Sequence, residues 1–209
     1  MGRSPERRDT TMQTTTRQYE PESMSLSGTE FTVEQTGTDG RMRPEYEARD
    51  VTGDTVFAAR YEMYQTPDTI AFTGPDGGEV CTVTASGNWD IAGDYVLTDD
   101  HTGEDLVVFD NDFSVLQDTW RLRDADDGSL LAAVDSRGGL VTAARKLLPL
   151  GQWIGHEYEV TDPAGDAVGS VESDFAILDE YDVTITDSSS VPAAPVVIGA
   201  VVVDAIQAN

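Results

Sequence analysis

The sequence of 209 residues contains a single cysteine, a single lysine and two histidines. One cysteine excludes an internal disulfide, and the place of Cys81 in the alternating segment from Val80 to Val83 predicts a small buried side chain. Because His101 and His156 are the only histidines, a zinc site built from histidine and cysteine is not expected. The sequence therefore indicates no metal site and no cofactor.

Basic side chains are also scarce: 13 Lys and Arg stand against 39 Asp and Glu, for a formal net charge of −26. Nucleic-acid binding needs clustered cations, so we expect no nucleic-acid partner, and the same charge disfavours an anionic membrane lipid. Repulsion among the carboxylates would weaken the compact state in dilute buffer. Near 1 M salt the Debye length falls to about 3 Å and screens this repulsion. The charge therefore predicts adaptation to a very salty cytoplasm, and the alternative is simply an acidic soluble protein.

Residues 1–24 are polar and show no hydrophobic periodicity, so we expect a disordered lead-in before the folded domain. Arg7 and Arg8 would suit a twin-arginine export signal, but the segment that follows them is polar instead of apolar. No signal peptide is predicted, and we expect the protein to be cytoplasmic.

A pattern of an aromatic residue, alternating side chains, an Asp, a Gly and a second alternating segment recurs along the chain. Alternation places one face inward, and Asp with Gly suits a tight turn because Gly adopts positive φ freely. Each copy is predicted to be a β-hairpin. The four clear copies begin at Tyr46, Tyr95, Trp120 and Tyr158, and two looser copies span Phe31 to Gly40 and Ile70 to Val83.

Six hairpins give about twelve strands, and such a sheet would expose long edges unless it closed on itself. The pattern predicts an all-β, closed, antiparallel barrel of about twelve strands. Residues 138–150 read either as a short helix ended by Pro149 or as a strand with a loop, and the pattern does not choose between them.

The chain ends in an almost uncharged apolar segment, residues 191–209, with Asp204 as its only charge. It is too short to cross a bilayer, which takes about 20 residues. Pro192 and Pro195 suit a helix start, and the polar residues 187–190 before them could cap it. We predict a central helix that fills the barrel, against the alternatives of a membrane anchor or a buried strand. Its central residues would be Pro195, Val197, Ile198, Val201, Val202, Ala205 and Ile206, with Gly199 allowing one wall to approach closely.

The segment from Asp182 to Asp187, followed by the segment from Pro195 to Ile206, resembles the C-terminal signature of the LURP-one-related family. The repeated hairpins and the sequence Gly-Gln-Trp-Ile-Gly at 151–155 are similar to the same family. It belongs to the Tubby C-terminal-like superfamily, together with the phospholipid scramblases. The resemblance implies that residues 25–209 form one domain, a twelve-stranded β-barrel around a hydrophobic C-terminal helix.

The resemblance implies little about activity. Many members of the family have no assigned function, Tubby domains bind phosphoinositides through basic residues, and scramblases move lipids with calcium. This chain lacks an evident counterpart of the basic pocket and has no cluster of cysteines to carry palmitate.

Five basic residues form the only candidate anion or phospholipid site: Arg121, Arg123, Arg137, Arg145 and Lys146. The alternative is that the first two pair with Asp on neighbouring strands and that the last two lie in a solvated turn. The acidic segment from Asp124 to Gly128 does not have the spacing of a calcium-binding loop, and we find no phosphate loop or nucleophile elbow.

We therefore expect a non-enzymatic binding or scaffold protein, whose partner is a protein or a small ligand at the barrel rim. The alternative is a membrane-associated, phospholipid-interacting protein of the scramblase type, and an enzyme is the third hypothesis.

Overall fold

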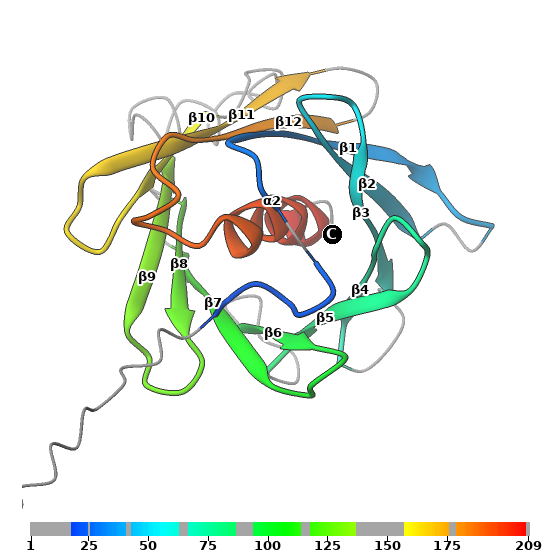
Figure 1. The fold of residues 1–209 in the computed structure, drawn as a ribbon, viewed down its shortest axis with the longest axis horizontal. Coiled ribbons are helices and arrows are strands. Elements are labelled where there is room, and N and C mark those ends of the chain that lie inside the picture. Colours follow the sequence, from blue (N-terminus) through cyan, green and yellow to red (C-terminus); the bar gives the residue numbers. More distant parts are fainter. Residues whose placement is uncertain are drawn as a thin grey trace, which may run out of the picture.

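Twelve antiparallel strands close into a barrel around one helix (Figure 1). The computed structural model describes residues 18–24, 26–40, 43–62, 67–86, 94–113, 118–136, 157–175 and 179–207. The strands are β1 (Glu30–Thr38), β2 (Pro44–Asp50), β3 (Thr55–Glu62), β4 (Thr69–Thr73), β5 (Glu79–Ala85), β6 (Tyr95–Asp99), β7 (Asp105–Phe113), β8 (Asp118–Asp124), β9 (Leu130–Ser136), β10 (Glu157–Thr161), β11 (Ala167–Phe175) and β12 (Asp179–Ile185); the helix is α2 (Ala193–Gln207).

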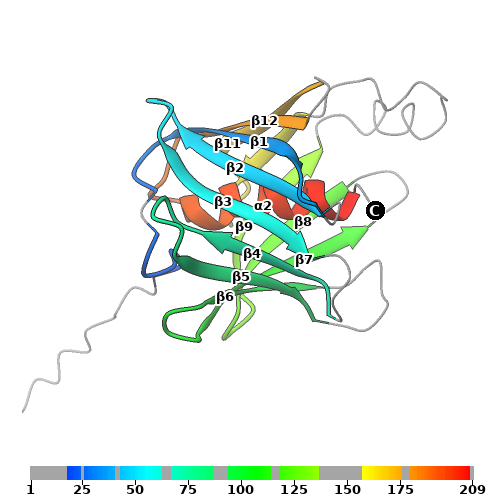
Figure 2. The ribbon, with the colours of Figure 1, turned by 90° about the vertical axis from the view of Figure 1, so that its right-hand side faces the viewer.

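Every strand pairs with its neighbours in the sequence, and β1 pairs with β12 to close the ring (Figure 2). Because the ring is closed, the sheet has no edge strand. The predicted fold class, a closed barrel of twelve antiparallel strands with one central helix, is confirmed.

The hairpins form where the repeated pattern predicts them. The four clear copies become β2–β3, β6–β7, β8–β9 and β10–β11, and the looser copy from Ile70 to Val83 becomes β4–β5. Their turn glycines all have positive φ, between 72° and 89°. The other looser copy differs: its residues from Phe31 onward run along the single strand β1, because no turn interrupts that segment before Thr38.

Alternation along the strands builds the core, as in β4, where Ile70 and Phe72 point inward and are almost fully buried. Phe72 meets Phe57 of β3 edge to face, with ring centroids 5.4 Å apart. This geometry suits the ring quadrupoles of two aromatic side chains.

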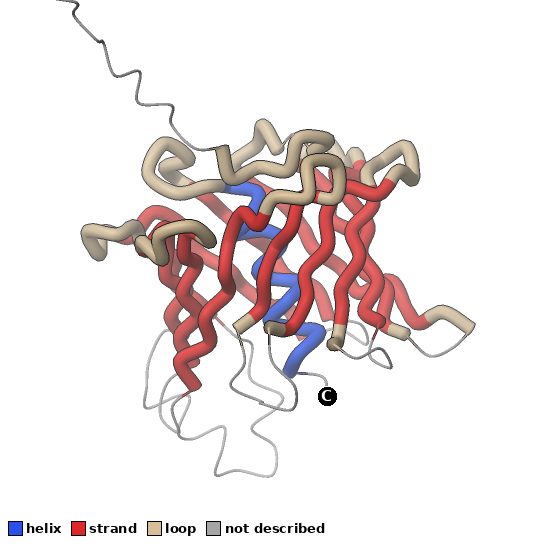
Figure 3. Tube along the Cα trace, turned by 90° about the horizontal axis from the view of Figure 1, so that it is seen from below, coloured by secondary structure: helices blue, strands red, loops and turns tan. Residues whose placement is uncertain are grey.

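Helix α2 runs along the inside of the barrel, as the tube in Figure 3 shows. Six of its predicted central residues are buried, and Ile206 near its C-terminal end is partly buried. The helix begins at Ala193, two residues before the predicted Pro195, which therefore lies in the first turn, where a missing N–H costs nothing. In the part of the chain that the structure describes, no helix combines the length and the apolarity that crossing a bilayer requires.

The predicted helix caps serve another purpose. The Asp187 carboxylate accepts hydrogen bonds from the hydroxyl groups of Ser189 and Ser190 and from the Ser189 backbone N–H. These bonds close a turn of their own between β12 and α2.

Residues 18–24 and 26–28 cross one end of the barrel in front of α2, and we call these residues the strap (Figure 1). Pro21, Met24 and Leu26 of the strap are buried. The predicted lead-in reached residue 24, so the structure differs from that boundary: residues 18–24 already pack on the barrel, because their few apolar side chains cover its end.

Candidate functional site

The two ends of the barrel are built differently. The connections β2–β3, β4–β5, β6–β7, β8–β9, β10–β11 and β12–α2 all lie at one end, which we call the turn end. It comprises residues 50–54, 74–78, 99–104, 124–129, 162–166 and 187–192. These segments contain twelve Asp and Glu and no Arg or Lys. The turn end is therefore strongly acidic.

In four of the five hairpin turns at this end, the turn opens on an Asp whose carboxylate holds it together. Asp50 accepts hydrogen bonds from the backbone N–H groups of Thr52 and Asp54, at 2.8 and 3.1 Å. Asp162 does the same for Ala164 and Asp166, at 2.9 and 3.0 Å. Such side-chain-to-backbone bonds explain why Asp recurs at this position of the sequence pattern.

Two of these turn carboxylates also bind the strap, and both are almost fully buried. The Asp99 carboxylate, 2% exposed, accepts a hydrogen bond of 2.6 Å from the backbone N–H of Glu22. The Asp124 carboxylate, 6% exposed, accepts one of 2.7 Å from the Tyr19 hydroxyl. Hydrogen bonds donated to a buried charged acceptor are among the stronger ones in proteins, so the two carboxylates anchor the strap at two points.

Between the strap and the barrel lies an open groove of about 470 Å³, which we call the rim groove. Tyr19 and Leu26 of the strap form one side, Leu130 and Leu131 of β9 another, and residues 188–195 between β12 and the first turn of α2 a third. Among the described residues that line it, Glu20 alone is charged. The rim groove is thus mainly apolar and is surrounded by an acidic end of the barrel.

The interior of the barrel is filled, as predicted. A space of about 20 Å³ lies between α2 and the strands β7 to β12. That volume holds about one water molecule. Gly199 of α2 faces Phe109 of β7, and an added Cβ would lie 3.3 Å from that ring. The glycine therefore allows the close approach that the sequence predicted.

One charged side chain of α2 lies inside the barrel. Asp204 is 5% exposed, and its carboxylate accepts a hydrogen bond from the Tyr181 hydroxyl of β12. Burial of a carboxylate is costly without such a partner, so this contact accounts for an Asp in an otherwise apolar helix.

Two of the five residues of the predicted basic cluster lie in the described part of the chain, both on β8. Arg123 forms an ion pair of 2.9 Å with Asp110 of β7 and donates a bond of 3.3 Å to the Gly128 carbonyl. Arg121 lies opposite Asp110 in the strand register. Cross-strand pairing is thus confirmed for Arg123. The other three, Arg137, Arg145 and Lys146, lie outside the described residues, as do residues 138–150, so the anion site stays a prediction.

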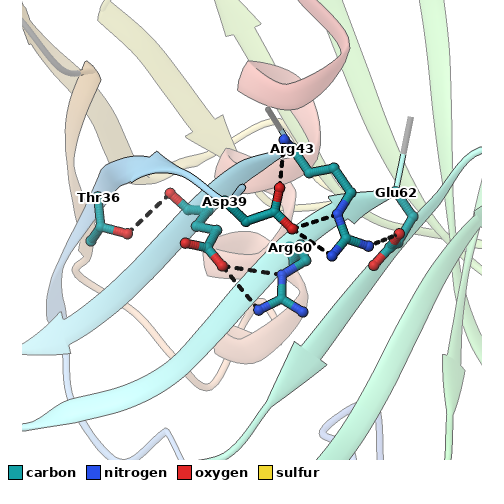
Figure 4. Close-up of polar contacts among 6 residues, drawn as sticks. Thr36, Asp39, Arg43, Arg60 and Glu62 are labelled. Atoms are coloured by element: carbon teal, nitrogen blue, oxygen red, sulfur yellow. Dashed lines mark hydrogen bonds and ion pairs between the residues drawn. The ribbon is translucent and has the colours of Figure 1, made fainter. Parts of the chain in front are cut away.

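A further basic residue, Arg43, holds three strands together at the end opposite the turns (Figure 4). Its guanidinium contacts Asp39, after β1, at 2.5 Å and also binds Glu62 at the end of β3. Hydrogen bonds with the two carboxylates raise the pKa of Arg43. Nearby, Arg60 binds Glu45 at 2.9 Å. These cations are compensated by carboxylates, so their role is structural.

The single cysteine is buried on β5, as expected, and its exposed fraction is 0%. Burial, with a smaller effect of Asp100 and Asp99, raises the pKa of the Cys81 thiol far above its usual value. The thiolate is the reactive form, so this side chain acts as a small apolar residue. Among the described residues, no group of three or more His, Cys, Asp or Glu could hold a metal ion.

The sequence led us to expect a partner at the barrel rim, but it did not predict the rim groove. Its walls come from the strap, β9 and the β12–α2 connection, which are more than 50 residues apart in the sequence. The available signals were Tyr19, Met24 and Leu26, apolar or aromatic residues in a stretch that otherwise reads as polar. The sequence matches no protein-family profile and no curated protein.

Proposed function

We propose that this protein is a non-enzymatic binding or scaffold protein of the LURP-one-related type, and that its partner docks in the rim groove. The observation that carries the proposal is the contrast between the space beside α2 and the rim groove. The space beside α2 has room for about one water molecule, whereas the rim groove offers about 470 Å³ of accessible, mainly apolar space.

The family assignment rests on the residues of the C-terminal signature and on the barrel with a central helix, which is the fold that the resemblance implies. Placement in a salty cytoplasm rests on the net charge of −26. The non-enzymatic role is supported by the use of the buried turn carboxylates Asp99 and Asp124, which bind backbone groups and the strap.

A library of displayed twelve-residue peptides, selected on the full chain in 2 M KCl, tests the site. Ser188→Trp fills the groove without changing charge, and Val51→Trp is the matched control at the same end of the barrel, where Val51 is 68% exposed. We expect the selected peptides to lose at least about tenfold in affinity for the first variant and to bind the second as they bind the wild type.

Recovery of no peptide, or of peptides indifferent to Ser188→Trp, contradicts the proposal. Flotation with vesicles of phosphatidylcholine and phosphatidylserine in the same salt tests the lipid alternative. A chain that floats with the vesicles supports a scramblase-like membrane protein instead.

A further inference from the structure

The rim groove has a mainly apolar lining, and the charged side chains around it are carboxylates. Leu26, Leu130, Leu131 and Val191 are among the apolar side chains that line it, and none of its described lining residues is a cation. An apolar groove of this kind accepts an aliphatic or aromatic anchor from a partner.

Three carboxylates lie on or directly before residues that line the groove. Glu20 lines it directly, Asp162 precedes the lining residue Pro163, and Asp187 precedes the lining residue Ser188. Hydrogen bonds from the hydroxyls of Ser189 and Ser190 lower the pKa of Asp187 and stabilise its charged form. A partner in the groove therefore meets fixed negative charges on several sides.

We propose that the rim groove binds a basic peptide segment of a partner protein, with Arg or Lys residues flanking an apolar anchor. This inference rests on the proposed function and names the class of partner. Charge complementarity selects the occupant: twelve carboxylates and no Arg or Lys in the turn end favour a cationic ligand. A second copy of this chain would bring the same negative end toward the groove, and an anionic lipid surface would be repelled as well.

The apolar floor has a particular value for a protein that works in concentrated salt. Screening limits ion pairs to contacts of a few ångströms, whereas excluded salts strengthen the burial of apolar surface. The apolar anchor of the partner then provides most of the affinity, and the carboxylates provide the specificity for a basic partner.

The sequences of the peptides selected in 2 M KCl give the first test. We expect those that lose affinity for Ser188→Trp to carry a net positive charge and at least one Leu, Ile, Phe or Trp. Neutral or acidic peptides that still depend on the groove would overturn this inference and leave the proposed function standing.

A charge swap at one position gives the second test, because Ser188 is exposed and only its charge and size change. Ser188→Glu should tighten binding of a selected basic peptide about two- to fivefold, and Ser188→Arg should weaken it by at least as much. Val51→Glu and Val51→Arg are the controls for long-range charge, and their difference should be smaller. Equal losses in both Ser188 variants would show a steric effect only and contradict the inference.

The oligomeric state, measured by sedimentation at 1 and 3 M KCl, tests the remaining alternative, which is that a second copy of this chain occupies the groove. A monomer that binds the basic peptide agrees with the inference. A dimer that the peptide does not dissociate, and that Ser188→Trp does, would assign the groove to a second copy of this chain and overturn it.

Discussion

At the scale of single residues, the turn carboxylates of this barrel accept hydrogen bonds that hold the turns, and these bonds favour the charged form of the carboxylate. The Thr52 hydroxyl is the main cause that lowers the pKa of Asp50. Burial opposes ionisation of Asp99, but bonds from the backbone N–H groups of Glu22, Thr102 and His101 outweigh it and lower its pKa. The folded state therefore binds these protons less readily than the unfolded state does.

That difference fixes the sign of a pH dependence. Because the folded-state pKa values of Asp50, Asp99 and Asp187 lie below the ordinary 3.8, their stabilisation is complete above about pH 5 and disappears as the pH falls through the lowered values. In 3 M KCl, where general repulsion is screened, we expect the urea midpoint to fall between pH 5 and pH 3. Asp187→Asn should be less stable at pH 7 and show a smaller fall. A midpoint that is constant or rises toward pH 3 contradicts this.

Gly169 of β11 shows a residue fixed by close approach of two strands. A Cβ at this position would lie 2.3 Å from the backbone carbonyl oxygen of Thr184 on β12, a distance that no side-chain rotation relieves. Gly169→Ala should lower the free energy of unfolding by about 1–3 kcal/mol through backbone displacement. Gly40→Ala is the matched control, because nothing lies within 4 Å of the added Cβ. Equal unfolding midpoints for the two variants would show that β11 and β12 separate freely.

At the scale of the element, α2 acts as the core of the barrel. Ile198 is 0% exposed in the middle of the helix, whereas Ile206 near its end is only partly buried. Ile198→Ala should therefore cost about 2–5 kcal/mol, through lost burial and a cavity that the ring of strands cannot close. Ile206→Ala should cost clearly less. Chemical denaturation in 3 M KCl measures both, and a larger loss at Ile206 would mean that the helix is held at its end.

The strap is the second element that decides the site. Its position depends on Tyr19 and Glu22, which reach Asp124 and Asp99, partners 105 and 77 residues away in the sequence. The sequence pattern of a short segment gives no signal for contacts at such a separation. The strap and the two turns each have the composition of an ordinary polar loop, so neither indicates that the other is its partner. The strap nevertheless forms one wall of the rim groove.

At the scale of the whole molecule, the sequence carries a net charge of −26, and the described carboxylates lie at the turn end and on the strands. Four described arginines, at positions 43, 49, 60 and 123, each lie within 4.0 Å of a carboxylate. Such pairs offset little of the total, so self-repulsion still acts on the folded chain.

We therefore expect the melting temperature to rise steeply from 0.1 to 2 M KCl as the carboxylates are screened. The same series in LiCl and NaCl separates general screening from an effect of one cation, and sorbitol at equal osmolality is the uncharged control. Full stability in 0.1 M KCl would contradict adaptation to high salt and leave an ordinary acidic protein.

The sequence by itself determined a closed barrel of about twelve strands, five of its hairpins and the apolar helix. Each of these follows from local rules: side-chain alternation, turn chemistry at Asp and Gly, and the cost of an exposed apolar segment. The segment from Phe31 to Gly40 shows the limit of those rules, since weak turn signals there predicted a hairpin where one strand runs through.

Only the tertiary structure decided how the ends of the barrel are finished. The rim groove and the bonds of the strap to Asp99 and Asp124 join segments that are separated in the chain. Their geometry depends on the closure of β1 on β12, which places residues from both ends of the sequence side by side. The reason is physical: alternation and turns act over a few residues, whereas a site is made by whichever side chains the closed ring brings together.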